Sequence, residues 1–114
     1  MNYEIVFAES RRSDQYVVNF VLQLPKITIA TFNRYVGLLS QHGPNIGLPY
    51  SKKLDANLFE LRIKGKIPVR IVYARHLRAN IIVLLHGFIK KSDKIAQNDL
   101  KTARDRYIYW LRHY

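Results

Sequence analysis

Cysteine is absent from this sequence of 114 residues, and glycine is sparse. Without cysteine the chain has no disulfide, no thiolate nucleophile and no cysteine-ligated zinc, a composition compatible with a reducing compartment. The five glycines are scattered along the chain and form no phosphate-binding loop. These absences exclude a disulfide-stapled scaffold and a P-loop nucleotide-binding enzyme.

Long apolar runs are also missing. No run approaches the roughly 20 residues of a membrane span. The stretch from Met1 to Glu9 lacks the basic region and the apolar region of a signal peptide. We therefore expect a soluble, cytoplasmic protein without a membrane partner.

Acidic residues are few, 8 against 19 basic ones, which gives a net charge of +11. Residues 1–50 hold four basic and three acidic side chains, so residues 51–114 carry the other +10. A generic solubilising charge would mix both signs along the chain. The uneven excess indicates a polyanionic partner. Nucleic acid fits better than membrane, because no strongly basic amphipathic helix with bulky apolar anchors is visible.

The length and the hydrophobic share, 48%, predict a single domain over residues 1–114 with an ordinary core. Residues 58–63 and 68–74 alternate with period two and predict a hairpin. Pairing Leu61 with Val69 makes the two apolar faces coincide, leaves a three-residue loop at 64–66 and sets Glu60 opposite Arg70.

The remaining segments complete an α+β domain with the order β-α-α-β-β-β-α. A strand is expected over residues 2–8, and a helix after Ser13 as its N-cap. A second helix begins near Pro25 and stops at Gly43. Residues 81–88 predict a central strand covered on both sides, and a last helix begins near Ala96. We expect a small antiparallel sheet with its helices on one face and the other face partly open.

The chemistry-bearing residues are basic. The four histidines show no metal-ligand spacing, no pair of carboxylates suits acid–base work on a glycoside, and no serine triad has a signature. We therefore expect neither a metal nor a cofactor. The candidates that remain are Lys52, Lys53, Arg62, Arg70, His86, Lys90 and Lys91.

This set suits metal-free cleavage of RNA, in which the 2′-hydroxyl attacks the adjacent phosphate. Arg62 and Arg70, held on strands, would stabilise the phosphorane. Crowding by cations lowers the pKa of a lysine in general, so the general base could be Lys52, Lys53 or Lys91. His86 could donate a proton to the leaving oxygen, or could make a structural hydrogen bond at the end of a strand.

Four motifs together resemble the RelE/ParE toxin superfamily, closest to its phage-derived HigB-like branch. They are Leu48-Pro49-Tyr50-Ser51-Lys52-Lys53-Leu54, Phe59-Glu60-Leu61-Arg62, Val69-Arg70-Ile71-Val72-Tyr73 and Leu84-Leu85-His86-Gly87-Phe88-Ile89-Lys90-Lys91. The resemblance implies a RelE-like fold and a type II toxin, a ribosome-dependent endoribonuclease (mRNA interferase) that inhibits translation. It also implies the ribosome, mRNA and a helix-turn-helix antitoxin as partners.

The family's arginines fall on Arg62 and Arg70, its basic pair after the last strand on Lys90 and Lys91, and the lysines before the sheet on Lys52 and Lys53. By this correspondence Arg62, Arg70, Lys91, His86 and Lys53 are the catalytic candidates, and Lys52 and Lys90 bind the substrate. Relatives commonly carry Thr-Pro where Ile95-Ala96 stands here, so the start of the last helix could differ.

Two other functions stay open. A ParE-like inhibitor of DNA gyrase would have the same fold without nuclease activity, and a non-catalytic nucleic-acid-binding module would also be basic. The density of cations favours the nuclease, since ParE-like toxins usually lack the basic cluster.

Overall fold

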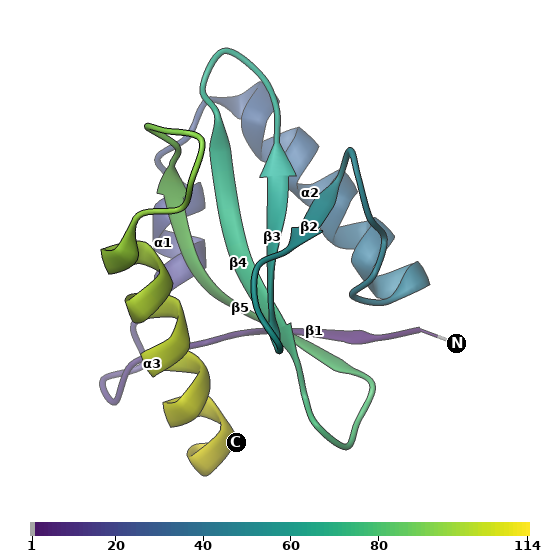
Figure 1. Ribbon diagram of the computed structural model, residues 1–114, viewed down its shortest axis with the longest axis vertical. Coiled ribbons are helices and arrows are strands. Elements are labelled where there is room, and N and C mark those ends of the chain that lie inside the picture. The colour runs from purple at the N-terminus through teal and green to yellow at the C-terminus, as the bar shows by residue number, and fades with distance from the viewer. Residues whose placement is uncertain (1) are drawn as a thin grey trace.

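Five strands and three helices follow one another along residues 2–114, the part of the chain that the computed structural model describes (Figure 1). In order they are β1 (Glu4–Phe7), α1 (Tyr16–Val21), α2 (Lys26–His42), β2 (Ser51–Lys53), β3 (Leu58–Ile63), β4 (Val69–Arg75), β5 (Ile81–Ile89) and α3 (Gln97–His113).

The strands form one mixed sheet in the order β1-β5-β4-β3-β2. The pairs β2–β3, β3–β4 and β4–β5 are antiparallel, whereas the edge strand β1 pairs with β5 in parallel. The predicted α+β class is confirmed. The sheet is not purely antiparallel, however, and it has a fifth strand, the three-residue β2, that the predicted order did not include.

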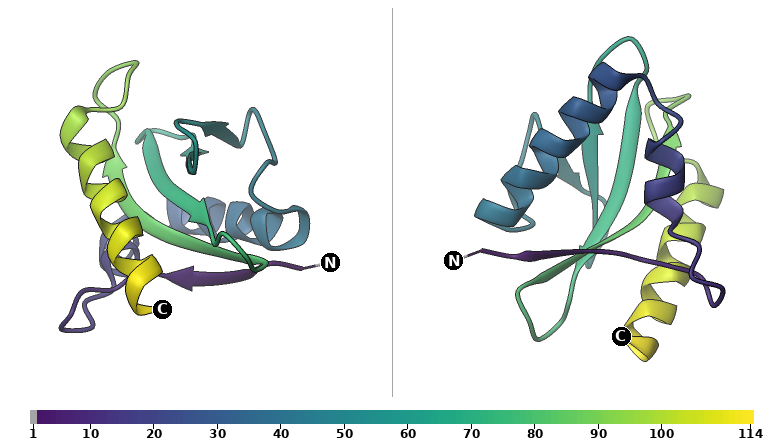
Figure 2. Two further views of the ribbon diagram at one scale, coloured as in Figure 1. Left: turned by 60° about the horizontal axis from the view of Figure 1, so that its bottom comes forward. Right: turned by 180° about the vertical axis from the view of Figure 1, so that it is seen from behind.

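Helices cover both faces of this sheet, so the expectation that they share one face was wrong (Figure 2). Helices α1 and α2 pack Val17, Val21, Phe32 and Leu39 onto a cluster that includes Leu61, Ile71 and Tyr73. On the other face the stripe Ala103, Tyr107 and Trp110 of α3 packs onto Val72, Val83 and Leu85. Strand β5 contributes to both clusters, which confirms it as a strand covered on both sides.

The β3–β4 hairpin differs from its predicted register by two residues. Leu61 pairs with Ile71 and Arg62 with Arg70, so the loop runs over residues 64–68. The predicted pairing would have placed Pro68 inside the ladder, where proline cannot donate a hydrogen bond. Because the shift is even, every side chain keeps its predicted face.

The helix ends test three further expectations. Helix α2 starts directly after Pro25 and ends at Gly43, whose φ of 89° is a conformation that glycine adopts readily. Helix α3 starts directly after Ala96, as predicted. Ser13 is not the N-cap of α1, because its own φ is 67° and the cap is Gln15.

The helices of residues 2–114 include none that is both long and apolar enough to cross a bilayer.

Gly87 on β5 leaves room for α1. A Cβ at this position would lie 2.4 Å from the ring of Phe20, closer than real side chains approach. We expect Gly87→Ala to lower the free energy of unfolding by about 1–3 kcal/mol through overpacking, measured by urea denaturation.

Gly37→Ala is the matched control, since Gly37 is exposed on α2 and a Cβ there would have no neighbour within 4 Å. This variant should gain up to about 1 kcal/mol from helix propensity. An unchanged stability of Gly87→Ala would contradict the packing of α1 on β5.

Candidate nucleic-acid interface

Two rows of side chains cross the sheet on the face that carries α3. The first row runs from Arg62 on β3 through Arg70 on β4 to Phe88 on β5. The second row lies two residues further along each strand and holds Lys52, Glu60, Val72 and His86. Directly opposed residues have Cβ atoms about 5 Å apart. The sheet therefore gathers Lys52, Arg62, Arg70 and His86, four of the predicted site residues, on one face.

Helix α3 covers only part of this face. It lies along β5, separated from β2 by β4 and β3 (Figures 1 and 2). Lys52 is exposed and Arg62 is partly exposed, whereas Arg70 is buried. The open part of the face is thus the side that carries Lys52 and Arg62.

Of the two arginines, only Arg70 is paired with a carboxylate of residues 2–114. The Arg70 Nη1 atom donates to the Val69 carbonyl at 3.0 Å, and its Nε lies 3.6 Å from a Glu60 oxygen. Burial lowers the pKa of Arg70; the carboxylate of Glu60 opposes this shift and the nearby Arg62 adds to it. No ion pair to Arg62 is found within residues 2–114, and its buried Nε has no hydrogen-bond partner there. The Arg62 side chain as a whole is partly exposed, and a guanidinium beside a second one suits an anion such as a phosphate.

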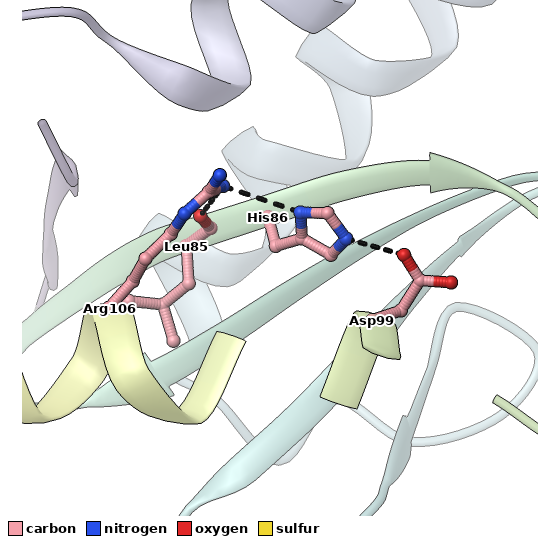
Figure 3. A network of polar contacts seen from close by, with 4 residues as sticks. All are labelled: Leu85, His86, Asp99 and Arg106. Carbon is pink, nitrogen blue, oxygen red and sulfur yellow. Dashed lines mark hydrogen bonds and ion pairs between the residues drawn. The ribbon is translucent and has the colours of Figure 1, made fainter. Parts of the chain in front are cut away.

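His86 is held from both sides by α3 (Figure 3). Its Nε2 lies 2.7 Å from an Asp99 oxygen, and its Nδ1 lies 3.3 Å from Nη1 of Arg106. Because a guanidinium can only donate, Nδ1 accepts from Arg106 and Nε2–H donates to Asp99. Burial lowers the pKa of His86, against the raising effect of its hydrogen bond to Asp99. Both ring nitrogens are occupied in the neutral ring, which favours the structural alternative over proton donation.

Asp99 and Arg106 are functional partners that the sequence analysis did not identify. They lie seven residues apart, which places them on one face of a helix, and this spacing was the available signal. Arg106 also donates to the Leu85 carbonyl at 3.0 Å and lies 3.5 Å above the ring of Tyr16. These contacts hold the middle of α3 against β5 and α1.

Phe88 was likewise missed as a site residue. Its ring stacks beside His86, with centroids 5.6 Å apart, and it is partly exposed at the end of the first row. An aromatic ring next to guanidinium groups is a surface on which a nucleic-acid base can stack.

The two lysine pairs are placed differently. Lys53 pairs with Phe59 and lies on the α2 face, opposite to Lys52, so the structure does not bring it to the arginines. Lys90 donates its backbone N–H to the Pro68 carbonyl at 2.7 Å, which holds the loop after β5 against the β3–β4 loop. Lys91 is exposed and lines a groove of about 530 Å³ together with Phe88 and Asp99. Residues 2–114 contain no cluster of three side chains suited to hold a metal ion.

Comparison with solved structures shows the same fold in a bacterial toxin. A free-state structure of an arginine-to-alanine double mutant of E. coli toxin RelE matches with a TM-score of 0.64 and 11% sequence identity. The match covers 93% of this chain and 98% of that chain. The fold is therefore RelE-like, as the motifs predicted.

The family model described as "Phage derived protein Gp49-like (DUF891)" matches residues 19–108. The chain belongs to this Gp49-like family, a RelE/HigB-like family of type II toxins. No curated protein sequence matches the chain.

The state of His86 predicts a pH dependence of stability. Its pKa is lowered on folding from 6.5, so the unfolded chain takes up the proton first as the pH falls. We expect the free energy of unfolding to decrease below about pH 6.5, at no more than about 1.4 kcal/mol per pH unit for this one proton. His86→Gln, which can still donate to Asp99 and does not titrate, should flatten this slope.

Urea denaturation between about pH 7 and pH 5.5 measures how the free energy of unfolding changes with pH. This range lies above the pH at which most carboxylates titrate. His113→Gln at the exposed end of α3 is the control and should keep the wild-type slope. Equal slopes for wild type and His86→Gln would contradict the assignment of a neutral His86.

Proposed function

We propose that this protein is the toxin of a type II toxin-antitoxin system and cleaves mRNA on the ribosome without a metal ion. The observation that carries the proposal is the direct pairing of Arg62 with Arg70 across β3 and β4, on a partly open sheet face of a RelE-like fold. Family membership supports the toxin, and the site supports the cleavage.

In the proposed reaction the 2′-oxygen of a ribose forms a bond to the adjacent phosphorus, and the bond from phosphorus to the 5′-oxygen breaks. The products are a 2′,3′-cyclic phosphate and a 5′-hydroxyl end. Negative charge grows on the phosphorane oxygens, where the guanidinium of Arg62 would stabilise it. Arg70, fixed by Glu60 and the Val69 carbonyl, acts as a positioning residue that adds positive potential.

The proton of the 2′-hydroxyl needs an acceptor within reach of this phosphate. Lys52 shares the face and the neighbouring row with Arg62, so it replaces Lys53 as the preferred general base, with Lys91 as the other candidate. His86 positions α3 and does not act as the acid, so the leaving 5′-oxygen takes its proton from solvent water. Phe88 would stack on a base, and Lys90 and Lys91 would bind the RNA backbone.

The partners follow from the same proposal. The ribosome would deliver mRNA to the open face. A helix-turn-helix antitoxin, which the family resemblance implies, would neutralise the toxin.

Arg62→Ala should reduce mRNA cleavage on translating ribosomes by about a hundredfold or more, because it removes the guanidinium that would stabilise the phosphorane. Primer extension on the mRNA measures this. Arg62→Lys keeps the charge without the planar fork and should recover only part of the activity. Arg78→Ala, an equal charge change in the exposed turn between β4 and β5, is the control and should cleave like wild type.

If wild type leaves mRNA intact and inhibits DNA gyrase instead, the ParE-like alternative holds and the nuclease is wrong.

Lys52 and Lys53 offer an internal comparison, since they are adjacent and exposed but lie on opposite faces. We expect Lys52→Ala to lower the cleavage rate by about a hundredfold, in the range of a lost general base, and Lys53→Ala to stay near wild type. The same primer extension assay decides, with thermal unfolding to show that both variants fold. A larger loss for Lys53→Ala than for Lys52→Ala would contradict the proposed role of Lys52.

A further inference from the structure

A cleft lies between the loop that follows β1 and the second half of α3, which run side by side (Figures 1 and 2). Its volume is about 710 Å³, a size typical of small-molecule sites. Its walls come from residues 9–16 and from residues 105–113 of α3. None of the side chains assigned to the proposed RNA interface lines it, so the cleft needs an explanation of its own.

The loop that forms one wall is held by its own hydrogen bonds. The Ser10 N–H donates to the Asp14 carbonyl at 3.0 Å, and the Ser10 hydroxyl donates to the Asp14 carboxylate at 3.1 Å. The Ser13 N–H donates to the Ser10 carbonyl at 2.9 Å, and a bridge between Glu9 and Gln15 closes the loop. The backbone of the loop is thus fixed without help from α3.

Two arginines project from the tip of this loop. Arg11 and Arg12 are exposed and line the cleft. No carboxylate of residues 2–114 forms an ion pair with either of them. Neighbouring guanidiniums with free donors on a fixed backbone suit the oxygens of phosphate groups.

Aromatic rings form the opposite wall. The Tyr109 ring stacks on His113, with centroids 4.0 Å apart and 21° between the planes. Tyr16 lies on the loop side and carries the Arg106 guanidinium 3.5 Å from its ring centroid. Both tyrosines are partly exposed. A planar heterocycle can stack on such rings, as nucleic-acid bases do.

Three carboxylates also line the cleft, and they differ in their engagement. Asp14 accepts from Ser10, and Asp105 accepts from Lys101 at 2.7 Å. Glu9 is exposed, and no ion pair to it is found in residues 2–114. A carboxylate can accept two parallel hydrogen bonds, and guanine offers two N–H donors side by side on one edge. Adenine has no such edge.

We propose that this cleft binds a guanine nucleotide with at least two phosphates, such as guanosine diphosphate (GDP). Arg11 and Arg12 would bind the phosphates, the base would stack on Tyr109, and Glu9 would accept from the N–H groups of the base. Because the sequence has no phosphate-binding glycine loop, side chains hold the phosphates here.

A single nucleotide fits the charges better than a strand of RNA does. The phosphates of a continuous strand would pass the carboxylates of Glu9, Asp14 and Asp105, which repel them. A single nucleotide can turn its phosphates toward the arginines and its base toward Glu9. The mixed charge also distinguishes this cleft from the arginine row on β3 and β4.

The cleft reaches the contacts that position α3. Arg106 lines it, and the same side chain donates to the Leu85 carbonyl and lies 3.3 Å from Nδ1 of His86. A nucleotide against Arg106 would therefore change the surroundings of His86. Through α3 it would regulate the proposed nuclease, and this part of the inference rests on the proposed function.

Calorimetric titration of the full chain with GDP tests the phosphate contacts. Arg12→Ala should weaken GDP binding about tenfold or more, because it removes a charged donor. Arg34→Ala removes the same charge from the exposed side of α2 and should bind GDP like wild type. Thermal unfolding without nucleotide shows that both variants fold.

A second pair of variants tests the base contact. Wild type should bind GDP more tightly than adenosine diphosphate. Glu9→Gln loses one acceptor of the pair and should weaken GDP binding about tenfold relative to adenosine diphosphate. Glu4→Gln makes the same charge change at an exposed position of β1 and should keep the preference for GDP.

Nuclear magnetic resonance of the His86 ring tests the location. Its signals should move when GDP binds, because Arg106 contacts both the cleft and the ring. Signals that stay in place with GDP bound would put the nucleotide elsewhere and overturn the site.

Three other results would also overturn the proposal. They are the absence of GDP binding, equal affinity of wild type for the two diphosphates, and an oligouridylate that binds the cleft more tightly than GDP, which would assign it to RNA. All these measurements are made without ribosomes. A chain that binds GDP and leaves mRNA intact would therefore reject the proposed function and keep the nucleotide site.

Discussion

The direct pairing of Arg62 with Arg70 is the constraint on which the site depends. Like charges opposite each other in a sheet are unfavourable, and burial adds a further cost for a charged group. Glu60 and the Val69 carbonyl offset this for Arg70 alone. Arg62 keeps a buried donor without a partner in residues 2–114. An anion bound beside the two guanidiniums would offset their mutual repulsion.

Helix α3 determines how much of this positive face stays open. Its apolar stripe packs on Val72, Val83 and Leu85, away from the arginine pair. The hydrogen bond between Asp99 and His86 fixes its first turn. In its middle, Arg106 donates to the Leu85 carbonyl and lies over the Tyr16 ring. These contacts keep the helix over β5 and prevent it from sliding across β3. His86 therefore helps to fix the position of α3, with both of its ring nitrogens engaged by that helix.

The sequence predicted what depends on local pattern and missed what depends on distant partners. Alternation over residues 58–63 and 68–74 correctly placed Arg62 and Arg70 on one face, and this survived a register error because the shift was even. Strand β2 has only three residues and no alternation of its own, so nothing local could separate Lys52 from Lys53. The parallel pairing of β1 and the contacts of His86 with α3 join residues far apart in the chain, and no spacing rule specified them.

A bulge in β5 explains why the site extends beyond the arginines. Opposite Val72 and Tyr73 the register shifts, and Leu85 is the extra residue between Leu84 and His86. Bulges commonly re-aim the side chains that follow them. With regular alternation Gly87 would lie opposite Arg70, and the rings of His86 and Phe88 would point toward α1. The bulge turns both rings to the arginine face and turns Gly87 toward Phe20, where only glycine fits. One inserted residue thus places the rings of His86 and Phe88 on the same face as the arginines.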